Sequence, residues 1–106
     1  MSQIDVINII HTYIQVLKQA GIVLDKAFLY GSYARNEASE DSDIDIMLVS
    51  RMFDTDDDYL LSKPWIYSSK VDPRIEPISI GLLRFNSDDA SPIIELVRQT
   101  GIEIQV

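Results

Sequence analysis

Apolar residues recur along this chain at two spacings, and the spacing changes from one segment to the next. Between residues 3 and 20, isoleucine and leucine return every three or four residues, which is the period of an amphipathic helix. These positions are Ile7, Ile10, Ile14 and Leu17. In 43–49 polar and apolar residues first alternate and then give way to an apolar run, as in a strand that becomes fully buried. The chain therefore combines helices with strands.

Residues that start or stop helices set the bounds of the expected elements. Ser2 can cap the first helix, with Asp5 three residues further on, and Gly21 can end it. Pro92 suits the start of a later helix and Gly101 its end. We expect helices over 3–20 and 89–100, strands over 26–30, 43–49, 74–80 and 102–106, a helical turn or loop over 32–38, and over 56–69 a helix that Pro64 interrupts.

The order of these elements predicts an α/β (α+β) fold, with a small mixed sheet of about four strands and helices packed against it. Pro77 lies inside the strand expected over 74–80, and proline suits an edge or a bulge better than a central strand. A length of 106 residues fits a single domain over 1–106.

Composition narrows the classes of function. There is no cysteine, which excludes disulfides, thiolate zinc sites and cysteine nucleophiles. No run of 18 apolar residues occurs, and no basic segment with a following apolar stretch opens the chain. We therefore expect a cytoplasmic protein without a membrane span or a secretion signal.

The formal net charge of −8 bears on the partners. Free-standing nucleic-acid binders are usually basic, because neutralising phosphates dominates their affinity. We expect no direct nucleic-acid binding here, and instead a small nucleotide carried with Mg²⁺ or a basic protein partner. The alternative explanation is that acidity only aids solubility.

The segment 31–45 contains the residues with the clearest chemistry. Gly31 follows an expected strand and lacks a Cβ, so a ligand can approach the backbone closely. Ser32 adds a hydroxyl beside the N–H groups of the next turn, and such groups bind phosphate. Asp43 and Asp45 leave the same face of the next strand, where two carboxylates favour a hard cation such as Mg²⁺.

Each half of this segment also has an ordinary explanation. Glycine and serine after a strand usually form only a turn, and Asp-x-Asp on a strand is often a solvated face. A phosphate-binding turn followed at this spacing by a pair of carboxylates is what metal-assisted nucleotidyl transfer requires. The combination therefore favours the functional interpretation.

The pattern Gly-Ser-x-Ala-Arg, then seven residues, then Asp-x-Asp resembles the signature of the DNA polymerase β-type nucleotidyltransferase superfamily. The match runs from Phe28 to Val49 and extends more loosely over nearly the whole chain. The short length resembles the minimal nucleotidyltransferase branch of that superfamily. Asn36 stands where the family commonly has glycine, and because asparagine tolerates positive φ we expect the turn to persist.

The resemblance implies roles for individual residues. Gly31 and Ser32 would hold the triphosphate, and Asp43 and Asp45 would ligate the metal ions. Arg35 would support the loop or a phosphate, although an ion pair with Glu37 or Asp41 is the alternative. Ser42 would begin the metal-bearing strand and orient it by a hydrogen bond.

The family also uses a third carboxylate, from a later strand, as a metal ligand or as the base that accepts the proton of the attacking hydroxyl. Glu76 is the first candidate because it lies within the strand expected over 74–80. Asp72 is the second candidate, but it precedes Pro73 and is expected in a turn.

Minimal domains of this kind resemble the antitoxin half of a two-protein module whose partner is an all-helical HEPN toxin. The implied function is Mg²⁺-dependent transfer of AMP from ATP to a hydroxyl of that toxin. Two alternatives stay open: an antitoxin that acts by binding alone, and a small-molecule nucleotidyltransferase subunit. The acidic run at 54–58 is typical of a solvated loop before a helix, and Trp65 of a core or an interface.

Overall fold

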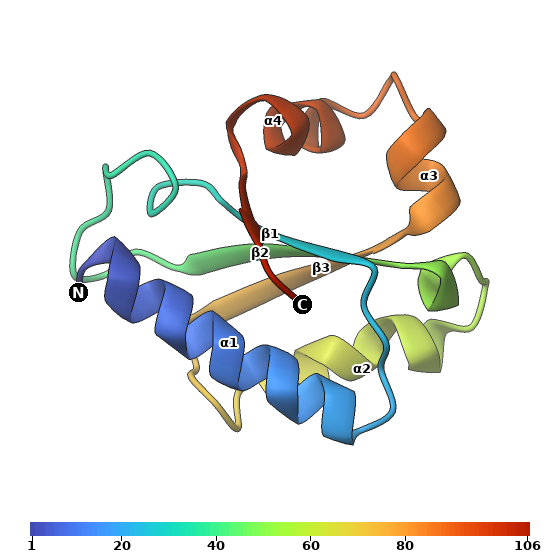
Figure 1. The fold of residues 1–106 in the computed structure, drawn as a ribbon, viewed down its shortest axis with the longest axis horizontal. Helices are drawn as coiled ribbons and strands as arrows, with labels where there is room; N and C mark the ends of the chain where they lie inside the picture. Colours follow the sequence, from blue (N-terminus) through green and yellow to red (C-terminus); the bar gives the residue numbers. More distant parts are fainter.

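Four strands form one mixed sheet, in the order β3–β2–β1–β4. The structure is a computed structural model that describes residues 1–106 (Figure 1). The strands are β1 (Lys26–Tyr30), β2 (Ile44–Ser50), β3 (Ile75–Gly81) and β4 (Ile102–Ile104). β2 and β3 are parallel, and β1 is antiparallel to both β2 and β4. The expected fold class is confirmed, and β3 with its Pro77 lies at the sheet edge, as predicted.

The helices are α1 (Gln3–Gln19), α2 (Asp58–Ser68), α3 (Leu82–Ser87) and α4 (Pro92–Thr100), and a short 3₁₀ turn, η1 (Arg51–Phe53), follows β2. In α1 the Ser2 hydroxyl accepts the N–H of Asp5 and the Asp5 carboxylate accepts the N–H of Ser2, so the predicted start is confirmed. α4 begins at Pro92, three residues later than predicted, because the Asp88 carboxylate holds a turn there. None of these helices combines the length and the apolar character needed to cross a membrane.

The interruption expected at Pro64 is wrong, because α2 continues through that residue. Proline removes one N–H donor from a helix, which weakens it. Here Pro64 is buried, and its carbonyl accepts a hydrogen bond from the hydroxyl of Tyr13 on α1. Tertiary contacts with α1 therefore stabilise a helix that local preference alone would break.

α3 was not predicted from the sequence. Its first residues follow β3 directly, and the residue before it, Gly81, has no side chain that could cap the helix. The carboxylate of Asp54, from the loop after η1, instead accepts the N–H of Leu83 at 3.0 Å. A cap supplied by a residue 29 positions away in the chain leaves no local signal.

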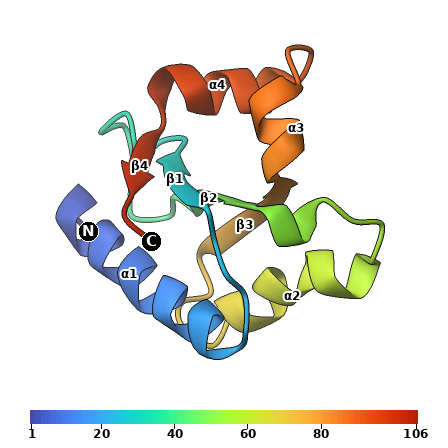
Figure 2. The ribbon, with the colours of Figure 1, turned by 45° about the vertical axis from the view of Figure 1, so that its right-hand side comes forward.

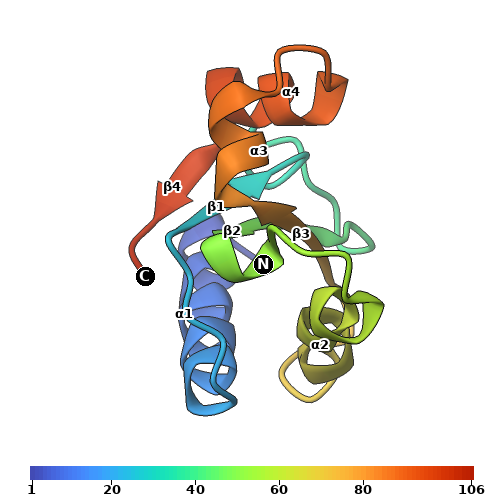
Figure 3. The same ribbon diagram turned by 90° about the vertical axis from the view of Figure 1, so that its right-hand side faces the viewer.

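The sheet lies between two helical layers, with α1 and α2 on one face and α3 and α4 on the other (Figures 2 and 3). β2 is apolar on both faces: Ile44, Ile46 and Leu48 join the core beneath α1 and α2, and Met47 and Val49 the core beneath α3 and α4. Asp45 lies between Ile44 and Ile46 in β2 and so projects from the same face as Met47 and Val49. Its side chain therefore belongs to the α3/α4 face, at the end of the sheet where β2 begins.

Two tyrosines buried on the α1/α2 side of the sheet differ in whether their hydroxyl is hydrogen-bonded, so their replacement by phenylalanine should affect stability differently. The Tyr13 hydroxyl donates to Pro64, whereas the Tyr33 hydroxyl has no hydrogen-bond partner. Tyr13→Phe removes this buried hydrogen bond and should lower the free energy of unfolding by about 0.5–1.5 kcal/mol. Tyr33→Phe removes an unpaired polar atom and should leave that energy unchanged or raise it. Urea unfolding of the two variants checks this, and equal losses would contradict it.

Candidate active site

Three side chains form a row across the sheet where β2 and β3 begin and β1 ends. In the strand register Tyr30 lies opposite Asp45, and Asp45 lies opposite Glu76. Residues directly opposite on neighbouring strands project from the same face, with close Cβ atoms. Asp43 precedes β2 and continues the alternation of Asp45. The fold thus brings Asp43, Asp45 and Glu76 to one corner of the α3/α4 face.

The carboxylates of Asp43, Asp45 and Glu76 place several negative charges close together at this corner. Asp45 is half-buried, while Asp43 and Glu76 are exposed. Burial, then the charges of Glu76 and Asp43, raise the pKa of Asp45 above its ordinary value, and the charge of Arg35 opposes them. Burial, followed by Asp45 and Glu76, raises the pKa of Tyr30 to about 12. A cation at this corner would relieve the repulsion.

Gly31 allows the Asp45 carboxylate to lie directly against the turn after β1. Its φ is +77°, in the left-handed region that side chains disfavour. A Cβ at this position would also overlap Oδ2 of Asp45. The glycine is therefore favoured by its own backbone conformation, and a side chain there would also displace the Asp45 carboxylate.

The turn after Gly31 exposes a set of backbone donors. The N–H groups of Ser32, Tyr33 and Ala34 donate to no atom of the chain, whereas those of the next three residues bond back to carbonyls within the turn. The carbonyl of Tyr33 accepts a hydrogen bond from the Gln3 side chain at 2.9 Å, which ties the turn to α1. Successive free N–H groups at the start of a turn are suited to an anion such as a phosphate.

Asn36, Arg35 and Ser42 are the remaining loop residues with an expected role. Asn36 has a φ of +56°, so the expectation that it replaces glycine in the turn is confirmed. Arg35 pairs with Glu37 at 3.0 Å, which was the alternative to a phosphate contact. The Ser42 hydroxyl accepts the N–H of Ser39 at 2.8 Å and so closes the loop just before β2.

The structure separates the two candidates for the third carboxylate. Asp72 lies in the turn before β3 and pairs with Arg74 at 2.6 Å, and this hydrogen bond lowers the pKa of Asp72. Glu76 instead lies opposite Asp45. No three carboxylate or imidazole side chains of the chain enclose a ready-made cation site, so Asp43, Asp45 and Glu76 would have to rotate toward one another to share an ion.

Sequence reasoning missed Tyr30, which it treated only as the apolar end of a strand. Its hydroxyl-bearing ring is buried beside Asp45, at the edge of the core under α3 and α4. The available signal was its position directly before Gly31, because a strand that ends there places its last side chain beside the turn with the predicted phosphate contacts. The mostly apolar sequence of β1 did not indicate which strand would pair with it.

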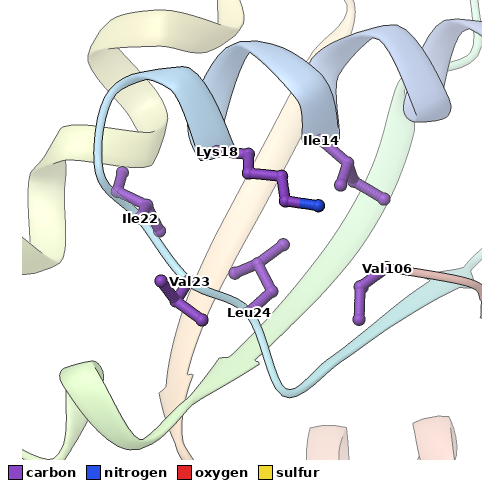
Figure 4. Close-up of a pocket in the computed structure, with 6 residues that line it drawn as sticks. All are labelled: Ile14, Lys18, Ile22, Val23, Leu24 and Val106. Carbon is purple, nitrogen blue, oxygen red and sulfur yellow. The ribbon is translucent and has the colours of Figure 1, made fainter.

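A hollow elsewhere on the surface is not this site (Figure 4). It lies between the end of α1, the segment that follows α1 and the C-terminal residue, and five of its six lining side chains are apolar. The lining residues are Ile14, Lys18, Ile22, Val23, Leu24 and Val106. None of the carboxylates described above contributes to it.

Comparison with known proteins identifies the family of this chain. The model of the family described as the nucleotidyltransferase domain matches residues 10–101. This chain belongs to the nucleotidyltransferase domain family. A crystal structure from Sulfolobus solfataricus, provisionally described as a nucleotidyltransferase, superimposes with a TM-score of 0.66 and 15% sequence identity, over 95% of this chain and 80% of that one. At that identity the likeness supports the fold alone, and no curated protein matches the chain.

Two glycines with positive φ provide a matched test of the turn in this nucleotidyltransferase domain. Gly21→Ala strains the backbone but meets no neighbouring atom, whereas Gly31→Ala adds an overlap with Asp45. We expect Gly21→Ala to cost about 1–2 kcal/mol of unfolding free energy and to leave binding of ATP with Mg²⁺ unchanged. Gly31→Ala should cost more and abolish that binding. Thermal unfolding and isothermal titration measure both effects, and normal ATP binding by Gly31→Ala would contradict the assignment.

The raised pKa of Asp45 predicts how stability depends on pH. The folded chain holds this proton to a higher pH than the unfolded chain does, so the Asp45 contribution to unfolding free energy falls as pH rises from its ordinary pKa of 3.8 through the raised one. Without metal, Asp45→Asn should therefore stabilise the protein at neutral pH and have little effect below pH 3.8. Urea unfolding in EDTA tests this, with the exposed Glu103→Gln as control. A loss of stability at neutral pH would show that Asp45 is not under repulsion.

Proposed function

We propose that this domain transfers AMP from ATP to a hydroxyl group of a partner protein, with Mg²⁺ as cofactor. The observation that supports it is the placement of Asp45 between Glu76 and the turn at Gly31. Carboxylates that can hold a metal therefore adjoin free N–H groups that can hold a phosphate. Membership of the nucleotidyltransferase domain family supports the general reaction, and the donor, cofactor and acceptor are our inference.

The residues at this corner fit Mg²⁺ by their chemistry. Carboxylate oxygens are the ligands that Mg²⁺ prefers, and it commonly takes only one or two from the protein while substrate phosphates supply others. Asp43 and Asp45 would hold the ion, with Glu76 as the third ligand. When bound, Mg²⁺ would neutralise charge on the triphosphate and lower the pKa of the acceptor hydroxyl.

The chain's own groups would position the reactants. The N–H groups of Ser32, Tyr33 and Ala34 would hold phosphate oxygens of ATP, and Gly31 would leave room for their approach. The acceptor oxygen forms a bond to the α-phosphorus, and the bond from that phosphorus to the bridging oxygen breaks, so that pyrophosphate leaves. Glu76 would either be that third ligand or accept the proton of the acceptor hydroxyl, since it is exposed and beside Asp45.

The openness of this corner favours a macromolecular acceptor. Asp43 and Glu76 are exposed, and neither lines a hollow in the surface. A small acceptor would make few contacts with the protein at this corner, whereas a partner protein can supply the surfaces that enclose the acceptor hydroxyl. A tyrosine is suited to this role, because its side chain is long and its hydroxyl has a lower pKa than that of serine or threonine.

We propose further that the partner is a helical toxin of the HEPN type and that this domain is its antitoxin, acting in the cytoplasm. The net charge of −8 would steer a basic partner, and association should then weaken with salt. The family resemblance stated above supports this identity, and the protein encoded beside this one is the partner to examine first.

Intact mass of that neighbouring protein, co-expressed with this domain, tests the proposal. With the wild type we expect one or more added AMP groups and loss of the partner's toxicity. The Asp43→Asn, Asp45→Asn double variant should add none, since both metal ligands are changed. Glu76→Gln should retain ATP binding and transfer AMP about 10²–10⁴ times more slowly, as expected for loss of a general base.

The same experiment separates the competing functions. Loss of toxicity with the double variant, and no change of mass, would favour an antitoxin that acts by binding alone. Unmodified partner in every sample, with its toxicity intact, would contradict both and leave a small-molecule acceptor. An unchanged rate with Glu76→Gln would remove that residue from the proton transfer.

A further inference from the structure

α2 carries more large exposed apolar side chains than the other long helices, α1 and α4. Its inner side packs toward α1 and β3 through buried Pro64 and half-buried Leu61 and Tyr67. Its outer side carries three large exposed residues, Tyr59, Trp65 and Ile66, with 67%, 57% and 48% of their surfaces accessible. Large apolar side chains that gather on an exposed surface often mark a site of interaction with another molecule. The outer side of α2 therefore has the composition of a surface that another molecule covers.

The exposed residues form a continuous stripe. Tyr59, Ser62, Trp65, Ile66 and Ser69 follow the three- and four-residue spacing of one helix face, and all of them are exposed. The stripe thus alternates large apolar side chains with small hydroxyls, along a helix of 11 residues, or about 16 Å. Trp and Tyr are the side chains most enriched at the centres of protein interfaces.

One end of the stripe is strongly acidic. Asp54, Asp56, Asp57 and Asp58 lie at or before the start of α2, are exposed, and form no ion pair. Asp54 and Asp57 cap α3 and α2, respectively, but the carboxylates of Asp56 and Asp58 make no hydrogen bond within the chain. Their charge is therefore available to a cationic partner.

We infer that this α2 surface, the exposed stripe together with the acidic end, docks an amphipathic helix of a partner protein that carries basic residues at one end. The apolar stripe is one helix wide, and the acidic end is complementary to lysine or arginine. A second copy of this chain fits less well, because it would bring two net charges of −8 together. The inference rests on the proposed function only for the role of the partner.

The α2 surface and the transfer site can be tested apart. α2 packs on the face of the sheet opposite to Asp45, and it contacts β3, the edge strand that also holds Glu76. A helix docked on α2 would hold its protein beside that edge without touching Asp43, Asp45 or the turn at Gly31. Changes on α2 should therefore alter docking and leave ATP binding intact.

Trp65 is the only tryptophan of the chain, so its fluorescence reports directly on the stripe. The probe is a synthetic helical peptide with leucines along one face and lysines at one end. Titration should move the Trp65 emission to shorter wavelength and reduce its quenching by acrylamide. A peptide of the same charge, with glutamine in place of leucine, is the control and should have little effect.

Variants identify the surface. Ile66→Ser should weaken binding of the leucine–lysine peptide about fivefold or more, as expected for loss of an interface contact. The Asp56→Asn, Asp58→Asn double variant should weaken it similarly at low salt and make it less sensitive to salt. The Asp43→Asn, Asp45→Asn double variant should bind the peptide like the wild type, even if AMP transfer proves absent. That result separates failure of the transfer proposal from failure of this one.

Three outcomes would overturn the inference. An unshifted Trp65 emission at saturating peptide would show that the stripe is not covered. An equal response to the glutamine peptide, or unchanged affinity in Ile66→Ser, would show that the apolar stripe contributes nothing. A shift that grows with protein concentration alone, with dimers in sedimentation, would assign the surface to a second copy instead.

Discussion

The parallel pairing of β2 with β3 is the constraint on which the rest of this structure depends. Its register sets Asp45 opposite Glu76, and a slip of one residue would turn Glu76 to the opposite face of the sheet. Parallel strands also require a crossover, here η1 and α2, which must pass along one face of the sheet. A single pairing thus both assembles the carboxylates and places α2, with its exposed stripe, on the other side.

That arrangement is stabilised by apolar packing at some distance from the charges. Both faces of β2 are buried from Ile46 onward, so the strand is held firmly just beyond the point where its first residues project carboxylates. The α1 side adds the contact of Gln3 with the turn. The apolar packing of β2 offsets the cost of holding Asp45 half-buried and close to the charge of Glu76.

Elements with a strong periodic pattern and local end signals were predictable from the sequence: α1 with its Ser2 cap, the four strands, and the sheet edge at Pro77. α3 and the passage of α2 through Pro64 were not, because Asp54 and Tyr13 stabilise them from distant positions. For the site, the chain order favoured Glu76 over Asp72. The register sets Glu76 opposite Asp45 and Asp72 pairs with Arg74, while the role of Glu76 stays a prediction. Tyr30 was missed because the sequence does not show which strand pairs with β1, and that pairing is what brings Tyr30 opposite Asp45. The metal and phosphate roles remain predictions.

The two edges of the sheet limit how this protein can meet other molecules. β3 carries Pro77, and β4, at the opposite edge, is only three residues long. Short edge strands and edge prolines are poor templates for an added strand, and so guard a protein against polymerising through its sheet. Association by strand addition is therefore disfavoured at both edges, and we expect a partner protein to contact the helices and loops of this domain instead.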